Sequence, residues 1–235
     1  MRRIFVALLI CIIGLMLVAQ SDASPYPDTE VNLLAAVTGE TQANANYNAF
    51  ATAAENEGRK EIAAIWRAIA EAELKHANDE FAILVSYDAT VVRPTPTAVL
   101  TGTTAANLQA AINGETYEYT IMYPAFVASA DAESETSARR IFNLARQAEQ
   151  VHAGIYADLL ANINNFDKAK YENIYRCPIC GNIILTNATT CPICGVQASN
   201  LVEYKIVDNS GSGSGCNFGF AILALGIIPF LIKRK

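Results

Sequence analysis

The chain of 235 residues contains two histidines, and each follows a glutamate by three positions. The pairs are Glu73 with His76 and Glu149 with His152. Residues i and i+3 share one face of an α-helix, so each pair can direct a carboxylate and an imidazole toward one point. Mixed oxygen and nitrogen ligands with open positions suit redox-active iron or manganese. The two pairs therefore predict a metal site that is built on helices.

Single glutamates complete a larger ligand set. A four-helix bundle holds a dinuclear carboxylate site with one glutamate from each of two helices and one Glu-x-x-His pair from each of the other two. Glu40 and Glu115 fit the single positions, and Glu118 adds a seventh candidate ligand one turn after Glu115. Four facing carboxylates would repel one another unless cations neutralise them. Taken singly, each glutamate could also be a solvated surface residue and each histidine a satisfied core residue.

Apolar residues at helical spacing indicate the elements that must position these ligands. They predict four long helices at 30–56, 59–86, 105–132 and 135–163, with a long connection over about 88–104. The two halves repeat: the Gly-Glu-Thr at Glu40 recurs at Glu115, and Tyr47-Asn-Ala-Phe recurs as Tyr123-Pro-Ala-Phe. We therefore expect two related helical hairpins.

The repeat offset is 75 residues at the first match and 76 at the later ones, so one extra residue lies between Glu115 and Tyr123. A residue inserted into a helix is usually absorbed as a π-bulge, often at a functional site. Pro124 follows directly and should bend the helix. The sequence predicts a distortion of the third helix near 117–123.

Four cysteines form two Cys-Pro-Ile-Cys-Gly segments, Cys177 with Cys180 and Cys191 with Cys194. Two such pairs in a short segment indicate a metal site, and tetrahedral sulfur ligation admits zinc or iron. So small a domain buries too little apolar surface to fold without its metal. Two disulfides are the alternative outside the cytoplasm, and the spacing does not separate iron from zinc.

Both ends of the chain have the composition of targeting segments. A basic start, an apolar run over 4–19 and small residues up to Ala23 predict a secretory signal peptide, with an uncleaved anchor as the alternative. A Gly/Ser tract precedes a 15-residue apolar run at 218–232 and a basic end. That run is short for a permanent span and resembles a bacterial sorting signal, with a plain membrane anchor as the alternative. We expect an exported protein at the cell surface or in the periplasm.

The net charge of −6 and the pI near 5.0 argue against a nucleic-acid partner, which needs a basic face. The expected organisation has four parts. They are a signal peptide at 1–23, a helical bundle at 24–166, a four-cysteine metal-binding domain at 170–208, and a linker with an anchoring or sorting segment at 209–235.

In combination and in this order, the motifs resemble the rubrerythrin family over about residues 30–207. They are Gly39-Glu40-Thr41-Gln42-Ala43, Glu73-x-x-His76-Ala77, Gly114-Glu115-x-x-Glu118-Tyr119, Met122-Tyr123-Pro124, Glu149-x-x-His152 and both Cys-x-x-Cys pairs. The resemblance implies a mainly α fold. A ferritin-like four-helix bundle would be followed by a small rubredoxin-like domain that has short β-strands and holds a metal through four cysteines.

The resemblance also assigns roles to single residues. It implies that seven residues bind two iron ions: Glu40, Glu73, His76, Glu115, Glu118, Glu149 and His152. It implies that Cys177, Cys180, Cys191 and Cys194 bind a third iron, or zinc in its place. Glu118 and His76 would exchange on one iron with redox state. Tyr47 would donate a hydrogen bond beside the ligands, or serve only as a core aromatic.

By the same resemblance, the function is reduction of hydrogen peroxide to water at a non-haem di-iron centre, in defence against oxidative stress. An unidentified donor would supply electrons through the iron of the four-cysteine centre. The family forms dimers or larger homo-oligomers in which the four-cysteine centre of one chain serves the di-iron site of another. A ferroxidase that uses O₂ and a non-catalytic, metal-stabilised surface protein are the alternatives. The two terminal apolar segments depart from the family pattern, and export would remove direct access to NADH.

Overall fold

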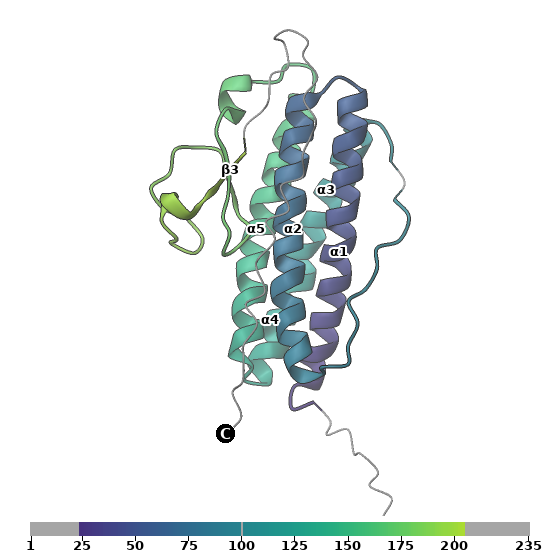
Figure 1. The fold of residues 1–235 in the computed structure, drawn as a ribbon, viewed down its shortest axis with the longest axis vertical. Coiled ribbons are helices and arrows are strands. Elements are labelled where there is room, and N and C mark those ends of the chain that lie inside the picture. The colour runs from purple at the N-terminus through teal and green to yellow at the C-terminus, as the bar shows by residue number, and fades with distance from the viewer. Residues whose placement is uncertain (1–23, 100, 205–235) are drawn as a thin grey trace, which may run out of the picture.

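The computed structural model describes residues 24–99 and 101–204, which form a long helical bundle with a small sheet packed against its side (Figure 1). The predicted signal peptide at 1–23 and the predicted linker and anchor at 209–235 lie outside the described residues. Within the described part, no helix is both long and apolar enough to cross a membrane.

The first hairpin consists of α1 (Pro27–Asn56) and α2 (Lys60–Tyr87). Pro27 stands in the first turn of α1, where its missing N–H costs no helical hydrogen bond. Gly58 adopts a φ of +78° in the tight turn between the helices, a conformation that glycine tolerates best. A connection then runs back along α1 to the start of the second hairpin (Figure 1).

The second hairpin has a divided first arm. It consists of α3 (Thr104–Tyr117), a π-helical turn η1 (Glu118–Met122) and α4 (Tyr123–Ala132), followed by the returning helix α5 (Thr136–Ala161). The Thr103 side chain caps α3 by accepting a hydrogen bond from the Ala106 N–H. The π-helical turn confirms the distortion predicted near 117–123.

Two buried clusters pack the bundle. One is centred on Trp66, whose ring lies 4.3 Å from that of Tyr156 between centroids and 5.1 Å from that of Tyr47. The other contains Leu33, Leu84, Tyr123 and Phe142 among its members. Burial of these large apolar side chains is the main favourable contribution to folding of the bundle.

The small domain follows α5. It contains a 3₁₀ turn η2 (Lys168–Tyr171), strands β1 (Ile174–Arg176) and β2 (Ile183–Ile184), a second 3₁₀ turn η3 (Ala198–Asn200) and strand β3 (Val202–Tyr204). The strands form an antiparallel sheet in the order β2-β1-β3, with Tyr175 opposite both Ile184 and Glu203. This mainly helical architecture with a small sheet confirms the expected fold class.

Candidate metal centres

Buried carboxylates and both histidines meet inside the bundle. Two groups of potential ligands share Glu73 and Glu149: one group adds Glu40 and His76, and the other adds Glu115 and His152. In each group, one ligand atom per residue lies within 4.8 Å of all the others. The structure thus brings together six of the seven predicted dinuclear ligands, with two glutamates common to both positions.

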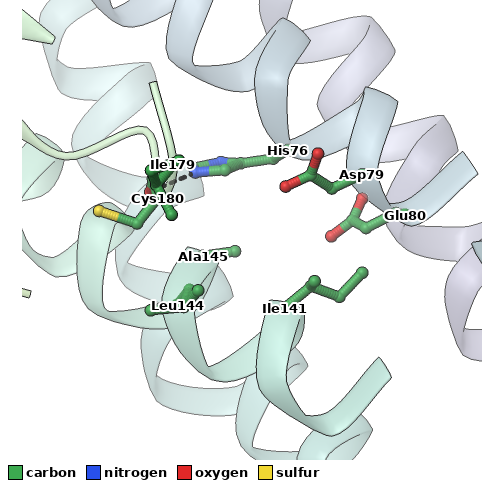
Figure 2. A pocket seen from close by; sticks show the side chains of 8 residues that line it. All are labelled: His76, Asp79, Glu80, Ile141, Leu144, Ala145, Ile179 and Cys180. Atoms are coloured by element: carbon green, nitrogen blue, oxygen red, sulfur yellow. Dashed lines mark hydrogen bonds between the residues drawn. The ribbon is translucent and has the colours of Figure 1, made fainter. Parts of the chain in front are cut away.

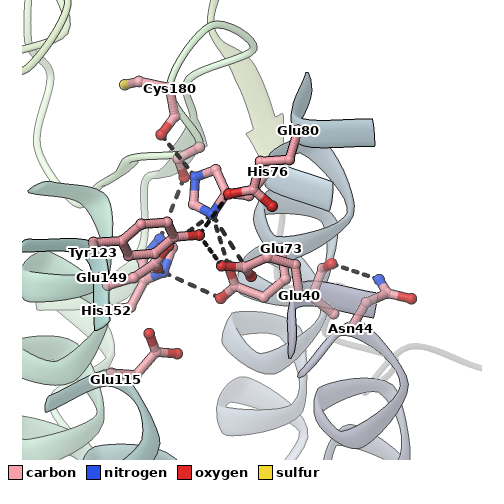
Figure 3. Close-up of polar contacts among 12 residues, drawn as sticks. Glu40, Asn44, Glu73, His76, Glu80, Glu115, Tyr123, Glu149, His152 and Cys180 are labelled. Carbon is pink, nitrogen blue, oxygen red and sulfur yellow. Dashed lines mark hydrogen bonds and ion pairs between the residues drawn. The ribbon is translucent and has the colours of Figure 1, made fainter. Parts of the chain in front are cut away.

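The imidazoles face the shared carboxylates in equivalent ways. His76 Nδ1 lies 3.1 Å from Glu73 Oε2 and 2.8 Å from Glu149 Oε1. His152 Nδ1 lies 3.2 Å from Glu73 Oε1 and 2.8 Å from Glu149 Oε2. Figure 3 shows these four side chains of α2 and α5 together with Glu40 from α1 and Glu115 from α3. The internal repeat of the sequence is therefore present as two matched halves of one site.

Several of these buried ligand atoms lack a hydrogen bond of ordinary geometry among the described residues. They are Glu40 Oε2, Glu73 Oε1, Glu115 Oε2, both carboxylate oxygens of Glu149, and His152 Nδ1. Buried polar atoms that remain unsatisfied are costly and rare in native proteins. Metal ions bound between these carboxylate oxygens and imidazole nitrogens would be the missing partners of all of them. This set of donor atoms suits iron. The residues fit a dinuclear metal centre.

The charges of the site are strongly coupled. Burial raises the pKa of Glu40 and of Glu115 well above the ordinary value, and neighbouring carboxylates raise both further. Burial would also raise the pKa of Glu149, but the two imidazolium groups beside it hold that pKa at about 2. Burial opposes protonation of His152, yet Glu73 and Glu149 raise its pKa to about 9. Without cations, the site therefore holds protons in their place.

A tyrosine supports each single glutamate. Tyr47 donates a hydrogen bond of 2.5 Å to Glu115 Oε1, as expected for its supporting role. Tyr123 donates to Glu40 Oε1, so the tyrosine of each half supports the single glutamate of the other half. The sequence reasoning did not include Tyr123 among the site residues. The repeat that pairs Tyr47 with Tyr123 is the signal that could have found it.

Two further glutamates lie beside the ligand groups. Glu118 is partly buried at the start of η1 and belongs to neither group of mutually close ligand atoms. It is close enough that its removal from water and the charges of Glu149 and Glu73 raise its pKa well above the ordinary value. Glu80, one turn after His76, lies with its Oε1 at 2.8 Å from the Tyr123 hydroxyl oxygen, within hydrogen-bonding distance. Sequence reasoning missed Glu80.

The four cysteines gather in the small domain, in a buried cluster against which Leu144 of α5 packs. Cys177 Sγ lies 3.4 Å from Cys194 Sγ, and Cys180 Sγ lies 3.6 Å from Cys191 Sγ. These separations exclude disulfides, whose sulfur atoms lie about 2.05 Å apart. They are close to the roughly 3.8 Å edge of a tetrahedron with metal–sulfur bonds of about 2.3 Å. Hydrogen bonds from the Cys180 side chain and from backbone N–H groups lower the pKa of Cys177 to about 5, which favours a thiolate.

The two candidate metal centres are in direct contact. His76 Nε2 lies 3.0 Å from the Cys180 carbonyl oxygen, and His152 Nε2 lies 3.4 Å from the Gly181 carbonyl oxygen. A metal-binding histidine commonly donates its second ring N–H to such a carbonyl. This contact lies within one chain. The family resemblance implies instead that the four-cysteine centre of one chain supplies electrons to the dinuclear site of another chain. The expected homo-oligomer stays a prediction.

Comparison with known proteins agrees with this geometry. The family described as Rubrerythrin matches residues 31–160. Nigerythrin of Nitratidesulfovibrio vulgaris is 40% identical over 164 residues, which cover 69% of this chain and 80% of that protein. Rubrerythrin-2 of Clostridium acetobutylicum is 36% identical over 169 residues, which cover 70% of this chain and 90% of that protein. The solved structure of fully reduced, all-ferrous nigerythrin matches with a TM-score of 0.72 and 37% identity, over 80% of this chain and 91% of that chain.

Proposed function

The chain belongs to the rubrerythrin family, and on that basis we propose that it is a non-haem di-iron peroxidase that reduces hydrogen peroxide to water. The observation that carries the proposal is the contact between the centres, in which His76 Nε2 meets the Cys180 carbonyl oxygen at 3.0 Å. An enzyme that is oxidised in every turnover must be reduced again. A four-cysteine centre placed on a ligand of the dinuclear site is suited to that task.

The reduction of one peroxide consumes two protons and two electrons and gives two waters. When bound, the two iron ions supply those two electrons without a radical intermediate in solution. The chain supplies geometry: Glu73 and Glu149 hold both metal positions, and Tyr47 and Tyr123 orient the two single glutamates. These supports preorganise the site, which lowers the cost of reorganisation during reaction.

Glu118 is proposed to respond to the charge of the site. The charges of Glu149 and Glu73, which belong to both ligand groups, act on its carboxylate. Its counterpart in the first half is Ala43, so one half of the site has such a residue and the other does not. We propose that Glu118 moves toward the group of Glu40 and His76 when the positive charge there increases. His76 is the proposed counterpart of that exchange.

Electrons would reach the dinuclear site through a short path. It runs from a cysteine sulfur along the Cys180 backbone to its carbonyl oxygen, and from there across one hydrogen bond to His76. The proposed third metal is therefore iron, because zinc in the four-cysteine site cannot change its charge. The proposed external donor is a small redox protein or carrier outside the cytoplasm.

Export, membrane anchoring and assembly are also proposals. They rest on the apolar runs at 4–19 and 218–232 and on the family resemblance. We propose an exported homo-oligomer that is held at the cell surface or in the periplasm through its C-terminal segment. Its task there would be to remove peroxide.

Anaerobic purification, metal analysis and rapid mixing test the proposal. We expect about three irons per chain and faster oxidation of the reduced protein by hydrogen peroxide than by O₂. Faster oxidation by O₂ would favour a ferroxidase, and zinc in both sites would favour a structural protein.

Two matched variants separate the steps of the proposed cycle. Glu149→Gln removes a ligand shared by both groups and should abolish the reaction with peroxide. Cys194→Ser disables only the thiolate centre. It should therefore retain the first oxidation by peroxide and lose the sustained turnover. Sustained turnover by Cys194→Ser would contradict the proposed electron path.

A further inference from the structure

Glu80 makes the two halves of the dinuclear site unlike each other. The repeat offset of 76 that relates His76 to His152 relates Glu80 to Tyr156. The Glu80 side chain is 1% exposed, and its Oε1 lies 2.8 Å from the Tyr123 hydroxyl oxygen. The Tyr156 hydroxyl has no hydrogen-bond partner among the described residues. Tyr123 is therefore within hydrogen-bonding distance of a second carboxyl group, that of Glu80, whereas the other half of the site has Tyr156 at the equivalent position.

Counting protons at Tyr123 constrains the state of Glu80. Its hydroxyl oxygen is within hydrogen-bonding distance of both Glu40 Oε1 and Glu80 Oε1 (Figure 3). A phenol has one proton and can donate to one acceptor. If Glu40 and Glu80 were both ionised, the Tyr123 proton could lie in only one of the two short contacts. The other contact would bring two oxygen atoms together with no proton between them. A second proton must therefore lie in this group of three.

When the ligand group holds its metal ions, the surroundings place that second proton on Glu80. Glu40 belongs to a metal-ligand group, whose cations favour its ionised form, whereas Glu80 belongs to neither group. Lys75, the nearest cation in the sequence, pairs with Asp79 instead. The titratable groups that face Glu80 come from every packed element: Glu40 on α1, His76 and Asp79 on α2, Glu118 on η1, Tyr123 on α4 and Glu149 on α5. Four of these six are acidic, so a further negative charge is disfavoured.

We propose that Glu80 is a further positioning residue of the dinuclear site, a carboxylic acid that donates to Tyr123 while Tyr123 donates to Glu40. The resulting chain of hydrogen bonds fixes which oxygen of Glu40 faces the metal. Tyr123 engages Oε1, and Oε2, which has no hydrogen-bond partner among the described residues, stays directed to the ligand group 4.0 Å from His76 Nδ1. Burial raises the pKa of Glu80 to about 8, in agreement with a neutral acid.

A small cavity adjoins these hydrogen bonds. It lies between α2, α5 and the first cysteine segment, and its lining includes His76, Asp79, Glu80 and Cys180 (Figure 2). Asp79 is partly exposed, so the cavity lies between the buried acid and the surface.

The inference rests on the proposed function only insofar as the site binds metal, and its test needs no peroxide. We suggest filling the four-cysteine site with a single equivalent of zinc, then titrating the metal-free dinuclear site of the full chain with cobalt(II) and following the visible absorption of the bound ion. Glu80→Leu and Tyr123→Phe each interrupt the hydrogen bonds and should weaken cobalt binding about 10-fold to 100-fold, as loss of outer support typically does. The double variant should lose no more cobalt affinity than either single variant, because Glu80 acts on Glu40 only through Tyr123.

Conservative and symmetry-related variants serve as controls. Glu80→Gln keeps an N–H donor toward Tyr123 and should bind cobalt with nearly the affinity of the unaltered chain. Tyr156→Phe changes the equivalent position in the other half and should leave the affinity unchanged. Unaltered affinity in Glu80→Leu, or equal loss in Glu80→Gln and Glu80→Leu, would overturn the proposal.

Infrared spectroscopy reports the proton itself. The cobalt-loaded chain should show the carbonyl stretch of a protonated carboxylic acid, and Glu80→Gln should lack it. This readout remains decisive if Glu80→Leu does not fold. Absence of that band from the unaltered, loaded chain would overturn the inference, even if peroxide turnover proved the proposed function correct. Failure of the dinuclear site of the unaltered chain to bind cobalt would overturn both.

Discussion

Protons and metal ions compete for the same buried atoms in the dinuclear site. A histidine ligand must be neutral, and a ligating carboxylate must be ionised. The carboxylates of Glu73 and Glu149 raise the pKa of His152 to about 9, and burial raises the pKa of Glu40 and Glu115. Below these values the metal-free groups carry protons that the metal must displace.

Metal uptake by the dinuclear site should therefore strengthen as pH rises from about 6.5 to about 9. Each bound ion releases protons, so the logarithm of the affinity increases with pH over that window. Cobalt(II) titrations at several pH values measure the slope, and calorimetry in buffers of different ionisation enthalpy counts the protons released. An affinity that is independent of pH would show that the histidines are neutral before metal arrives.

The stability of the metal-free chain should change in the opposite direction. The raised pKa of His152 contributes stability that is fully present below its unfolded value of 6.5 and is lost as pH rises through about 9. Urea unfolding of the metal-free chain at pH 6.5 and pH 9 measures this loss directly. The metal-loaded chain is the control, because its metal-bound histidines are already neutral and do not titrate between pH 6.5 and pH 9.

Replacing Glu118 with alanine should preserve the fold and slow peroxide turnover by about 10-fold to 100-fold. The fold should survive because Glu118 is only partly buried and the equivalent position of the first repeat is Ala43. Turnover should fall because the site loses the carboxylate that we propose adjusts to a change in metal charge. Steady-state peroxide reduction measures the effect, with Tyr117→Phe, an exposed change at the preceding residue, as the control. Unchanged turnover would exclude a role for Glu118.

At the scale of elements, the π-helical turn explains how two repeats of different length form one symmetric site. Glu40 and Tyr47 are seven positions apart, which is close to two turns of an α-helix. Glu115 and Tyr123 are eight positions apart, and in a regular helix the tyrosine would be rotated away by about 100°. The turn Glu118–Met122 absorbs the extra residue. Tyr123 therefore faces Glu40 as Tyr47 faces Glu115.

Much of the fold and of the ligand set follows from patterns that are local in the sequence. Helical periodicity and the spacing of Glu73 from His76 are properties of single helices, and the repeat located the π turn. Glu80 could not be predicted, because a glutamate one turn after another polar residue usually lies in solvent. Its role depends on Tyr123, which another helix supplies.

The contact between the centres could not be read from the sequence either. Both cysteine segments have the same letters, Cys-Pro-Ile-Cys-Gly, yet they have different neighbours in the fold. Gly181 and Gly195 both adopt left-handed φ values, of +75° and +77°. An added Cβ would lie 2.2 Å from His76 Nε2 at Gly181, and would meet nothing within 4 Å at Gly195.

This difference provides a matched pair of variants. Gly181→Ala should displace the first cysteine segment from His76 and slow electron transfer between the centres, whereas Gly195→Ala carries the same backbone strain without the clash. Stopped-flow spectroscopy after peroxide addition follows the oxidation of the thiolate iron. We expect it to slow by at least roughly tenfold in Gly181→Ala only. Equal rates in the two variants would mean that this contact does not carry the electrons.

At the scale of the whole molecule, the small domain is part of the bundle and not a tethered appendage. Ile174 and Ile183 of its sheet belong to the same buried cluster as Trp66 and Leu159 of the bundle. Glu71 on α2 accepts a hydrogen bond from the Tyr204 hydroxyl and pairs with Arg176 at 3.4 Å. This shared core holds the cysteine segment on the histidines of its own chain.

This arrangement leads to a test of which chain supplies electrons to which site. Two inactive chains are combined under different affinity tags: Glu149→Gln, which lacks a working dinuclear site, and Cys194→Ser, which lacks a working thiolate centre. Assemblies that contain both chains are purified through both tags and supplied with iron. If each four-cysteine centre serves its own chain, no subunit has both centres intact. We then expect no sustained peroxide turnover.

Recovery of turnover in the mixed assemblies would show that electrons pass between chains, as the family resemblance implies, and would contradict the contact of Cys180 with His76 as the working path. An assembly of two unaltered chains with the same tags is the positive control. The intrachain contact at 3.0 Å predicts mixed assemblies without sustained turnover, because a single chain already contains the donor centre, the bridging carbonyl and the acceptor histidine.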